Sequence, residues 1–260
     1  MIIHNFDPVF IDLGFFQIRW YALAYIAGIV IGLIYGKKIA IYIKKKVFKY
    51  NVNPNLVEDL IPYLIIGIIL GGRLGYVLFY NFNYYINNLT DIIKIWQGGM
   101  SFHGGLIGIV IASIWFGKKN NQNSFLYTDI ISLVAPIGIF FGRIANFLNS
   151  ELIGRETDIF WSVKFVLIDN ISRHPSQIYE AILEGLVLFF ILLFACKKYL
   201  VLRSPGNASA IFLIFYGVFR IISEIFRLPD EQIGYIFGQV SIGMIISLPM
   251  VILGIILFNR

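Results

Sequence analysis

The chain has 260 residues, of which 58% are hydrophobic and only 14% are charged, and its mean hydropathy is +0.78. Soluble domains carry about a quarter charged residues, so this composition indicates an integral membrane protein and excludes an ordinary soluble enzyme. The single cysteine, Cys196, excludes an internal disulfide and any cluster of cysteine ligands. Residues 1–17 contain Asp7, Pro8 and Asp12 and no Lys or Arg, so we expect no cleavable signal peptide.

Seven apolar stretches approach the length of about 20 residues that a helix needs to cross a bilayer. The sequence therefore predicts an all-α, polytopic membrane protein with seven transmembrane helices in a single domain over residues 1–260. The predicted spans are 17–36, 57–80, 99–117, 126–147, 177–196, 207–226 and 236–258. The third span is the weakest of the seven because it holds several glycines, which membrane helices nevertheless tolerate.

The basic residues predict the direction of the spans. Twelve Lys and Arg residues follow spans one, three, five and seven, six lie on the opposite side, and three lie inside spans. Cytoplasmic loops are the ones enriched in Lys and Arg, so we expect the N-terminus outside and the C-terminus in the cytoplasm. Loops 81–98 and 148–176 are then extracytoplasmic. Because topology explains the net charge of +6, it gives no reason to expect a nucleic-acid partner.

Apart from Glu58, Asp59 and Asp129 at cytoplasmic span starts, nearly all polar side chains inside the spans fall into one layer. At the rise of an α-helix, this layer lies roughly a third of the way in from the outer face. The members of this layer are Tyr21, Arg73, His103, Arg143, Asn146, Tyr179, Glu180, Glu184, Tyr216, Arg220 and Glu224. Ionisable groups in a membrane are costly and mark functional sites by default. A transporter needs polar groups near the midplane, so a layer in one leaflet favours an enzyme that acts on a lipid headgroup. The histidines are too isolated to suggest a zinc site, and we expect neither metal nor cofactor.

The arginines of this layer suit a phosphate. Guanidinium stays charged and binds phosphate oxygens in pairs. Arg143 and Asn146 share one helical face, and the structural alternative for Arg143 is an ion pair with Glu151 or Glu180. Arg220 lies four residues before Glu224, and here the alternative is an internal pair that neutralises itself.

The remaining candidates are less distinctive. His103 lies among glycines that leave space for a substrate, and histidine can act as a base near neutral pH. Tyr21 could be an ordinary aromatic residue of the membrane interface. Arg73 is balanced between a second phosphate contact and a role in helix packing. Ser176 could cap the fifth span.

Five ordered motifs together resemble the bacterial prolipoprotein diacylglyceryl transferase family over nearly the whole chain. They are Trp20-Tyr21, the run from Gly98 to Gly105 (GGMSFHGG), residues 142–155 with Arg143, Asn146, Asn149, Glu151 and Gly154, the run His174-Pro175-Ser176-Gln177, and the series Tyr216, Gly217, Arg220, Glu224, Arg227, Pro229 and Asp230. Gly238-Gln239 also looks similar.

The resemblance implies transfer of the diacylglyceryl group of phosphatidylglycerol to the thiol of a lipobox cysteine in a prolipoprotein signal peptide. A thioether forms and glycerol phosphate leaves, as the first step of lipoprotein maturation at the plasma (inner) membrane, with the active site toward the extracytoplasmic side. The resemblance marks the positions of Tyr21, Asn146 and Gly154 as important. As a mechanistic hypothesis, we expect catalytic roles for His103, Arg220 and Tyr21. We expect substrate binding by Arg143, Asn146, Glu151, Gly154, Tyr216, Glu224 and Arg73, with Glu151 orienting an arginine.

Two departures from the family pattern matter. Ala22 stands where the family usually has glycine, and the loop from Arg155 to Arg173 is short. The competing hypotheses are a transporter or flippase of anionic lipids, a membrane scaffold, and a phosphatidyl or acyl transferase. The last usually needs an acidic metal cluster or a histidine–aspartate pair, and His103 has no acidic residue within four positions.

Overall fold

The computed structural model describes residues 2–47, 52–198, 201–229, 234–236, 238 and 240–260. Five of its described helical runs are long and apolar enough to cross a membrane: α1 (Trp20–Lys46), α2 (Leu56–Phe79), α5 (Ser124–Leu148), the run Ser176–Lys198, and α8 (Asn207–Glu224). Helices α4 (Phe102–Lys119) and α9 (Ile242–Phe258) occupy the other two predicted positions. The helical, multi-pass membrane class is therefore confirmed, whereas the number of seven crossings stays a prediction.

The other described elements are short. The run Ser176–Lys198 consists of α6 (Ser176–Glu180), the π-helix η3 (Ala181–Val187) and α7 (Leu188–Lys198). The remaining ones are β1 (Ile2–His4), β2 (Val9–Asp12), β3 (Gln17–Arg19), α3 (Phe82–Asn87), η1 (Leu89–Ile93), η2 (Ile95–Gln97), β4 (Val163–Phe165), β5 (Ser172–Arg173), η4 (Val201–Arg203), β6 (Tyr235–Ile236) and β7 (Val240–Ser241).

Two predicted boundaries were wrong. Helix α1 continues ten residues beyond position 36, because Ile39, Ala40 and Ile43 bury one face of the extension. The lysines that end this helix suit the negative end of its dipole. Helix α9 begins at Ile242 rather than near 236, because β6 and β7 form an antiparallel hairpin there.

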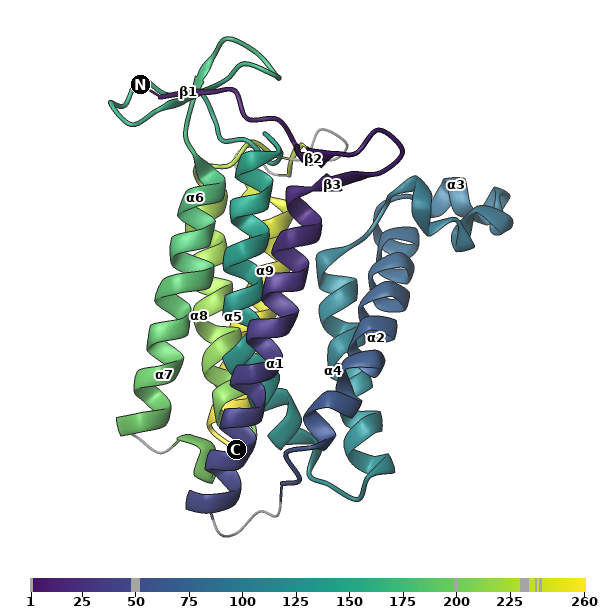
Figure 1. Cartoon of the computed structure of the whole chain (residues 1–260), viewed down its shortest axis with the longest axis vertical. Helices are drawn as coiled ribbons and strands as arrows, with labels where there is room; N and C mark the ends of the chain where they lie inside the picture. The colour runs from purple at the N-terminus through teal and green to yellow at the C-terminus, as the bar shows by residue number, and fades with distance from the viewer. Residues whose placement is uncertain (1, 48–51, 199–200, 230–233, 237, 239) are drawn as a thin grey trace. The chain divides into compact units, whose positions relative to one another are not determined.

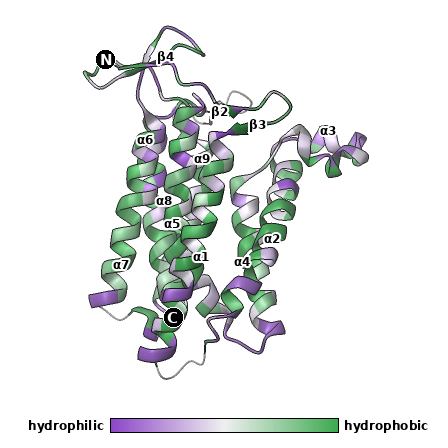
Figure 2. Ribbon diagram, in the orientation of Figure 1, coloured by the Kyte–Doolittle hydropathy of each residue, from purple (hydrophilic) through white to green (hydrophobic). Residues whose placement is uncertain are grey.

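The chain forms two compact units, one of residues 1–36 and 131–260 and the other of residues 37–130. In the first unit, α8 packs against α9, α7 and η3. Figure 1 shows α6, α7, α8 and α9 in this unit with the parts of α1 and α5 that belong to it. Gly28 of α1 lies against Gly138 of α5, and Gly185 of η3 lies against Phe140 of α5. Hydrophobic residues run along these helices and hydrophilic residues gather at their ends, as Figure 2 shows, which is the pattern of a membrane bundle.

A small sheet covers one end of the first unit (Figure 1). Strand β1 pairs in parallel with β4, with Ile2 opposite Val163, and β4 pairs antiparallel with β5. The buried face of this sheet includes His4 and Phe165. The sheet thus ties the start of the chain to the predicted outer loop 148–176.

The second unit is built on the close pair α2 and α4. A Cβ atom on Gly71 would overlap the carbonyl oxygen of Gly104, and one on Gly108 would overlap that of Gly67. Small residues of this kind let membrane helices approach backbone to backbone. The glycines that weakened the prediction of the third span are therefore the ones that pack it. The single domain over residues 1–260 stays a prediction beside these two units.

Candidate active site

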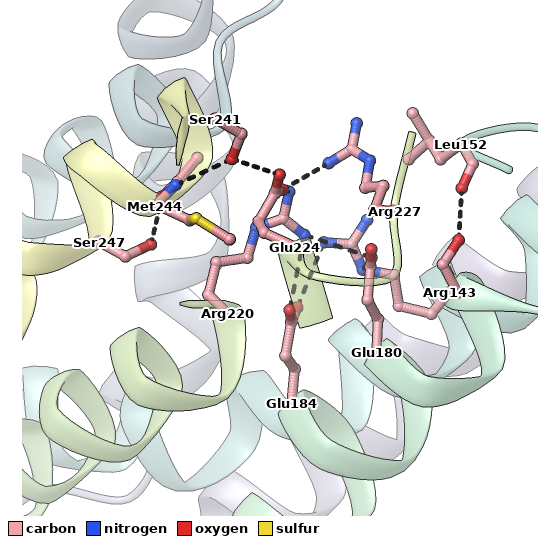
Figure 3. A network of polar contacts seen from close by, with 12 residues as sticks. Arg143, Leu152, Glu180, Glu184, Arg220, Glu224, Arg227, Ser241, Met244 and Ser247 are labelled. Carbon is pink, nitrogen blue, oxygen red and sulfur yellow. Dashed lines mark hydrogen bonds and ion pairs between the residues drawn. The ribbon is translucent and has the colours of Figure 1, made fainter. Parts of the chain in front are cut away.

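Three arginines and three glutamates of the first unit form one buried ion-pair network, shown in Figure 3. Its members are Arg143 of α5, Glu180 of α6, Glu184 of η3, Arg220 and Glu224 of α8, and Arg227 just after α8. Their opposite charges balance, which is the condition under which buried charges are tolerated. The network brings together residues from 143 to 227 in the chain.

Arg143 joins the network through two atoms of its guanidinium. Its Nε lies 2.8 Å from Oε2 of Glu180, and its Nη2 lies 3.3 Å from Oε2 of Glu184. Its side chain is 15% exposed, compared with 9% for each of the other two arginines. Arg143 is therefore the arginine of the network that a solute reaches most easily.

Arg220 connects the two halves of the network. Its Nη1 lies 3.3 Å from Glu180 Oε2 and 3.5 Å from Glu184 Oε1. Its Nη2 pairs with Glu224, one turn further along α8. The fully buried Glu180 is thus shared by Arg143 and Arg220, so a change at one arginine is felt by the other.

Glu224 is the second centre of the network. Besides Arg220, it accepts hydrogen bonds from Nη1 of Arg227 at 3.2 Å and from Oγ of Ser241 at 2.7 Å. Gly243 lies against this carboxylate, since a Cβ atom there would sit 2.6 Å from Oε1 of Glu224. The Ser241 side chain also accepts from the amide of Met244 and so links Glu224 to the start of α9.

The local backbone explains how two glutamates reach two arginines. Glu184 lies in the π-helix η3, and such wide turns are rare and occur often at functional sites. A Cβ atom on Gly185 would meet Cβ of Phe140 at 2.7 Å, so only glycine lets α5 and η3 approach this closely. Tyr216, predicted to bind substrate, is 1% exposed and stacks on Phe212 one turn before Arg220.

A second cluster joins Tyr21, Asn146 and Glu151. The Tyr21 hydroxyl donates to Oε2 of Glu151 at 2.5 Å, and Nδ2 of Asn146 contacts the same oxygen at 3.4 Å and the Tyr21 hydroxyl. Asn146 lies one turn after Arg143 on α5, so this cluster adjoins the arginine network. The contacts of Glu151 are with Tyr21 and Asn146, whereas the sequence suggested that it orients an arginine.

Gly154 is enclosed by backbone. Its backbone forms an isolated antiparallel β-bridge with that of Arg227, and a Cβ atom on Gly154 would overlap the carbonyl oxygen of His174. Its own carbonyl accepts from Nη1 of Arg173 at 3.3 Å. These contacts give Gly154 a packing role beside Arg227, and substrate binding by it stays a prediction.

His174 and Ser176 lie at the entrance of α6. His174 Nδ1 lies 3.2 Å from the hydroxyl of Tyr179, and burial, aided by the nearby positive charge of Arg155, lowers the pKa of His174. The prediction that Ser176 caps this helix was wrong. The N-cap residue is Pro175, and Ser176 instead donates to the carbonyl of Leu152 at 3.0 Å.

Arg73 and His103 belong to the second unit. The guanidinium of Arg73 is buried and donates to the carbonyls of Asp91, Ile92, Lys94, Gly98 and Gly99. These bonds favour the packing alternative for Arg73 over a phosphate contact. His103 lies in the first turn of α4, after the cap Ser101, and its ring packs edge-on against Phe102 at 5.4 Å. A role for either residue in binding or catalysis stays a prediction.

Sequence reasoning missed part of the network. It counted Arg227 among the basic residues outside the spans, although Arg227 follows Glu224 by only three residues and belongs to the motif series that begins at Tyr216. It named Glu180 as an alternative partner of Arg143 but not Glu184, whose spacing of four residues was the available signal. The motif residues Asp230 and Gln239 lie outside the described residues.

Comparison with known proteins agrees with these motifs. The family model described as prolipoprotein diacylglyceryl transferase matches residues 8–260. The chain is 49% identical over 254 residues to the phosphatidylglycerol–prolipoprotein diacylglyceryl transferase of Rickettsia canadensis, covering 98% of this chain and 96% of the relative. It is 49% identical to that of Rickettsia typhi, over 100% of this chain and 98% of the relative, and 48% identical to that of Rickettsia bellii, over 100% and 97%. The chain belongs to the prolipoprotein diacylglyceryl transferase family.

Proposed function

We propose that the protein transfers the diacylglyceryl group of phosphatidylglycerol to the cysteine thiol of a prolipoprotein lipobox. The sulfur forms a bond to the terminal glycerol carbon of the diacylglyceryl group, and the bond from that carbon to the phosphate-ester oxygen breaks. Glycerol phosphate leaves with the electron pair, and the thiol proton passes to a base or to the leaving phosphate. The names of the relatives supply both substrates.

The arginine network is the observation that carries this proposal. Three guanidinium groups lie within one ion-pair network, and Arg143 is the most exposed of them. A phosphate, like the carboxylates of Glu180 and Glu184, can accept two hydrogen bonds from one guanidinium, so it can take over bonds that those carboxylates now accept. Arg143 and Arg220 then stabilise the charge that builds on the phosphate as the carbon–oxygen bond breaks.

The cluster of Tyr21, Asn146 and Glu151 supports the other half of the reaction. It offers a hydroxyl, an amide and a carboxylate next to Arg143 on α5. Asn146 positions the headgroup, and the Tyr21 hydroxyl, held by Glu151, helps the thiol reach the thiolate, which is the true nucleophile. His103 is the alternative candidate for the base.

The membrane placement is part of the proposal. Seven spans with the N-terminus outside put the loop from residue 148 to 176 on the extracytoplasmic side of the plasma membrane. The basic C-terminal ends of α1, α4 and α7 support this direction. Donor lipid and acceptor signal peptide then meet in the outer leaflet.

The variant Arg143→Ala tests the proposal in phosphatidylglycerol vesicles supplied with a lipobox peptide. Removing one preorganised group that stabilises developing charge costs about 10²–10³ in kcat, so we expect a loss of that size in the mass-shifted peptide. Arg203→Ala, which removes an exposed arginine of η4, is the matched control and should keep the full rate. Transfer at the wild-type rate by Arg143→Ala would refute the role of Arg143 in binding the phosphate.

A further inference from the structure

Glu151 lies in an unusual stretch of backbone. The residues on either side of it, Ser150 and Leu152, have φ angles of +56° and +53°. Non-glycine residues avoid this left-handed region, and each one costs about 1–3 kcal/mol unless its surroundings hold it in place. Such strain is concentrated at functional sites, so the contacts that hold this backbone are informative.

Three side chains from outside the loop hold it. Gln177 donates from Nε2 to the carbonyl of Glu151 at 2.5 Å, and Ser176 donates from Oγ to the carbonyl of Leu152 at 3.0 Å. On the other side, Nδ1 of His4 lies 3.2 Å from Oγ of Ser150. Gln177 and Ser176 are both fully buried, so their bonds do not compete with water.

The direction of these bonds matters for the carboxylate. Gln177 binds the main chain of Glu151 itself, and the side chain of Glu151 accepts from the Tyr21 hydroxyl. One turn later on the same helix, Glu180 pairs with Arg143 and Arg220. Helix α6 therefore holds the main chain of Glu151 through Gln177, and it holds Arg143 and Arg220 through Glu180.

We infer that Gln177, assisted by Ser176, is a positioning residue that holds the strained backbone of Glu151 so that its carboxylate meets the Tyr21 hydroxyl. The expected effect on the reaction rate rests on the proposed function, whereas the expected effect on the backbone does not. Without the bond from Gln177, the loop relaxes toward ordinary φ values and the carboxylate swings away from Tyr21. Substrate binding at the arginines is kept, so the effect falls on kcat rather than on KM.

The test compares Gln177→Met, which keeps length and volume but removes the donor, with Ser113→Ala. Ser113 is also fully buried and donates to a backbone carbonyl, that of Ile109 at 2.7 Å in α4, outside the site. We expect Gln177→Met to lower kcat at least tenfold with KM for phosphatidylglycerol changed less than twofold. We expect Ser113→Ala to change neither constant by more than twofold.

Hydrogen exchange gives a second measurement that needs no activity. The amides of residues 149–153 should exchange at least tenfold faster in Gln177→Met, while the helices keep their protection and the melting temperature stays near that of Ser113→Ala. In a background of Tyr21→Phe, which removes the hydroxyl that Glu151 meets, Gln177→Met should lower the residual rate less than twofold.

The outcomes separate the two claims. If the wild-type protein shows no transfer while Gln177→Met still exchanges faster than wild type in residues 149–153, the proposed function is refuted and the positioning role stands. The positioning role is refuted if exchange in residues 149–153 is unchanged. It is also refuted if the loss of kcat equals the loss of folded protein, or if Gln177→Met and Tyr21→Phe multiply their effects.

Discussion

Replacing Glu224 by leucine tests whether the buried network holds the fold as well as the site. Glu224 accepts from Arg220, from Arg227 at 3.2 Å and from Ser241 at 2.7 Å, and it is only 4% exposed. Removing one partner of a buried ion pair leaves an uncompensated charge and costs about 3–5 kcal/mol. The variant leaves two arginines without this partner, so we expect a loss within that range in the free energy of unfolding.

The assay is unfolding in mixed micelles by titration with sodium dodecyl sulfate, followed by tryptophan fluorescence. Glu58→Leu is the control, because the pair of Glu58 with Lys37 is 52% and 35% exposed and such pairs contribute about 0–1 kcal/mol. The reasoning is refuted if Glu224→Leu destabilises the protein no more than Glu58→Leu does.

Three further predictions concern single groups. Arg143→Lys should lower kcat/KM about 10²-fold in vesicles, because an ammonium cannot replace a planar fork that pairs with two carboxylates; an unchanged rate would contradict the phosphate role. Gly154→Ala should lower the melting temperature and the activity, because its Cβ would overlap the His174 carbonyl, whereas Gly138→Ala, with nothing within 4 Å, should not. The pKa of His174 is lowered in the folded protein, so the unfolded chain takes up the proton first and stability falls as pH drops below about 6.5. The melting temperature of His174→Asn should therefore fall less than that of the wild type between pH 7.5 and pH 5.5. Equal falls in the two proteins would show that His174 does not cause this pH dependence.

Much of the fold was accessible from the sequence because membrane helices are defined by composition and length. Each predicted span lies at a described helix, and the boundaries failed where a different force decided them. Burial of Ile39, Ala40 and Ile43 extended α1 past Lys37 and Lys38, and a two-strand hairpin delayed the start of α9. Lys37 and Lys38 interrupt the apolar run, which resumes at residues 39–43, and hydropathy does not distinguish an apolar hairpin from the start of a helix.

The sequence predicted the arginines of the site well, but it did not predict how the glutamates pair with them. An arginine inside a span is conspicuous because of its cost, which is why Arg143 and Arg220 were found. The glutamates were in the predicted layer, but the pairing of Glu184 with Arg143 needed three-dimensional information, because Glu184 lies in a π-helix that hydropathy does not predict. The strained loop around Glu151 could not be predicted either, because Ser150 and Leu152 are not residues that usually adopt a positive φ.

The central claim is that phosphate departure and thioether formation are one event at this site. The direct measurement is the amount of glycerol phosphate released by the purified protein in phosphatidylglycerol vesicles, with and without a lipobox peptide. We predict one glycerol phosphate for each peptide that gains a diacylglyceryl group, and release at the level of protein-free vesicles when the peptide is absent or its cysteine is replaced by serine. Equal release with and without the peptide, or peptide-independent movement of lipid without any release, would contradict the account.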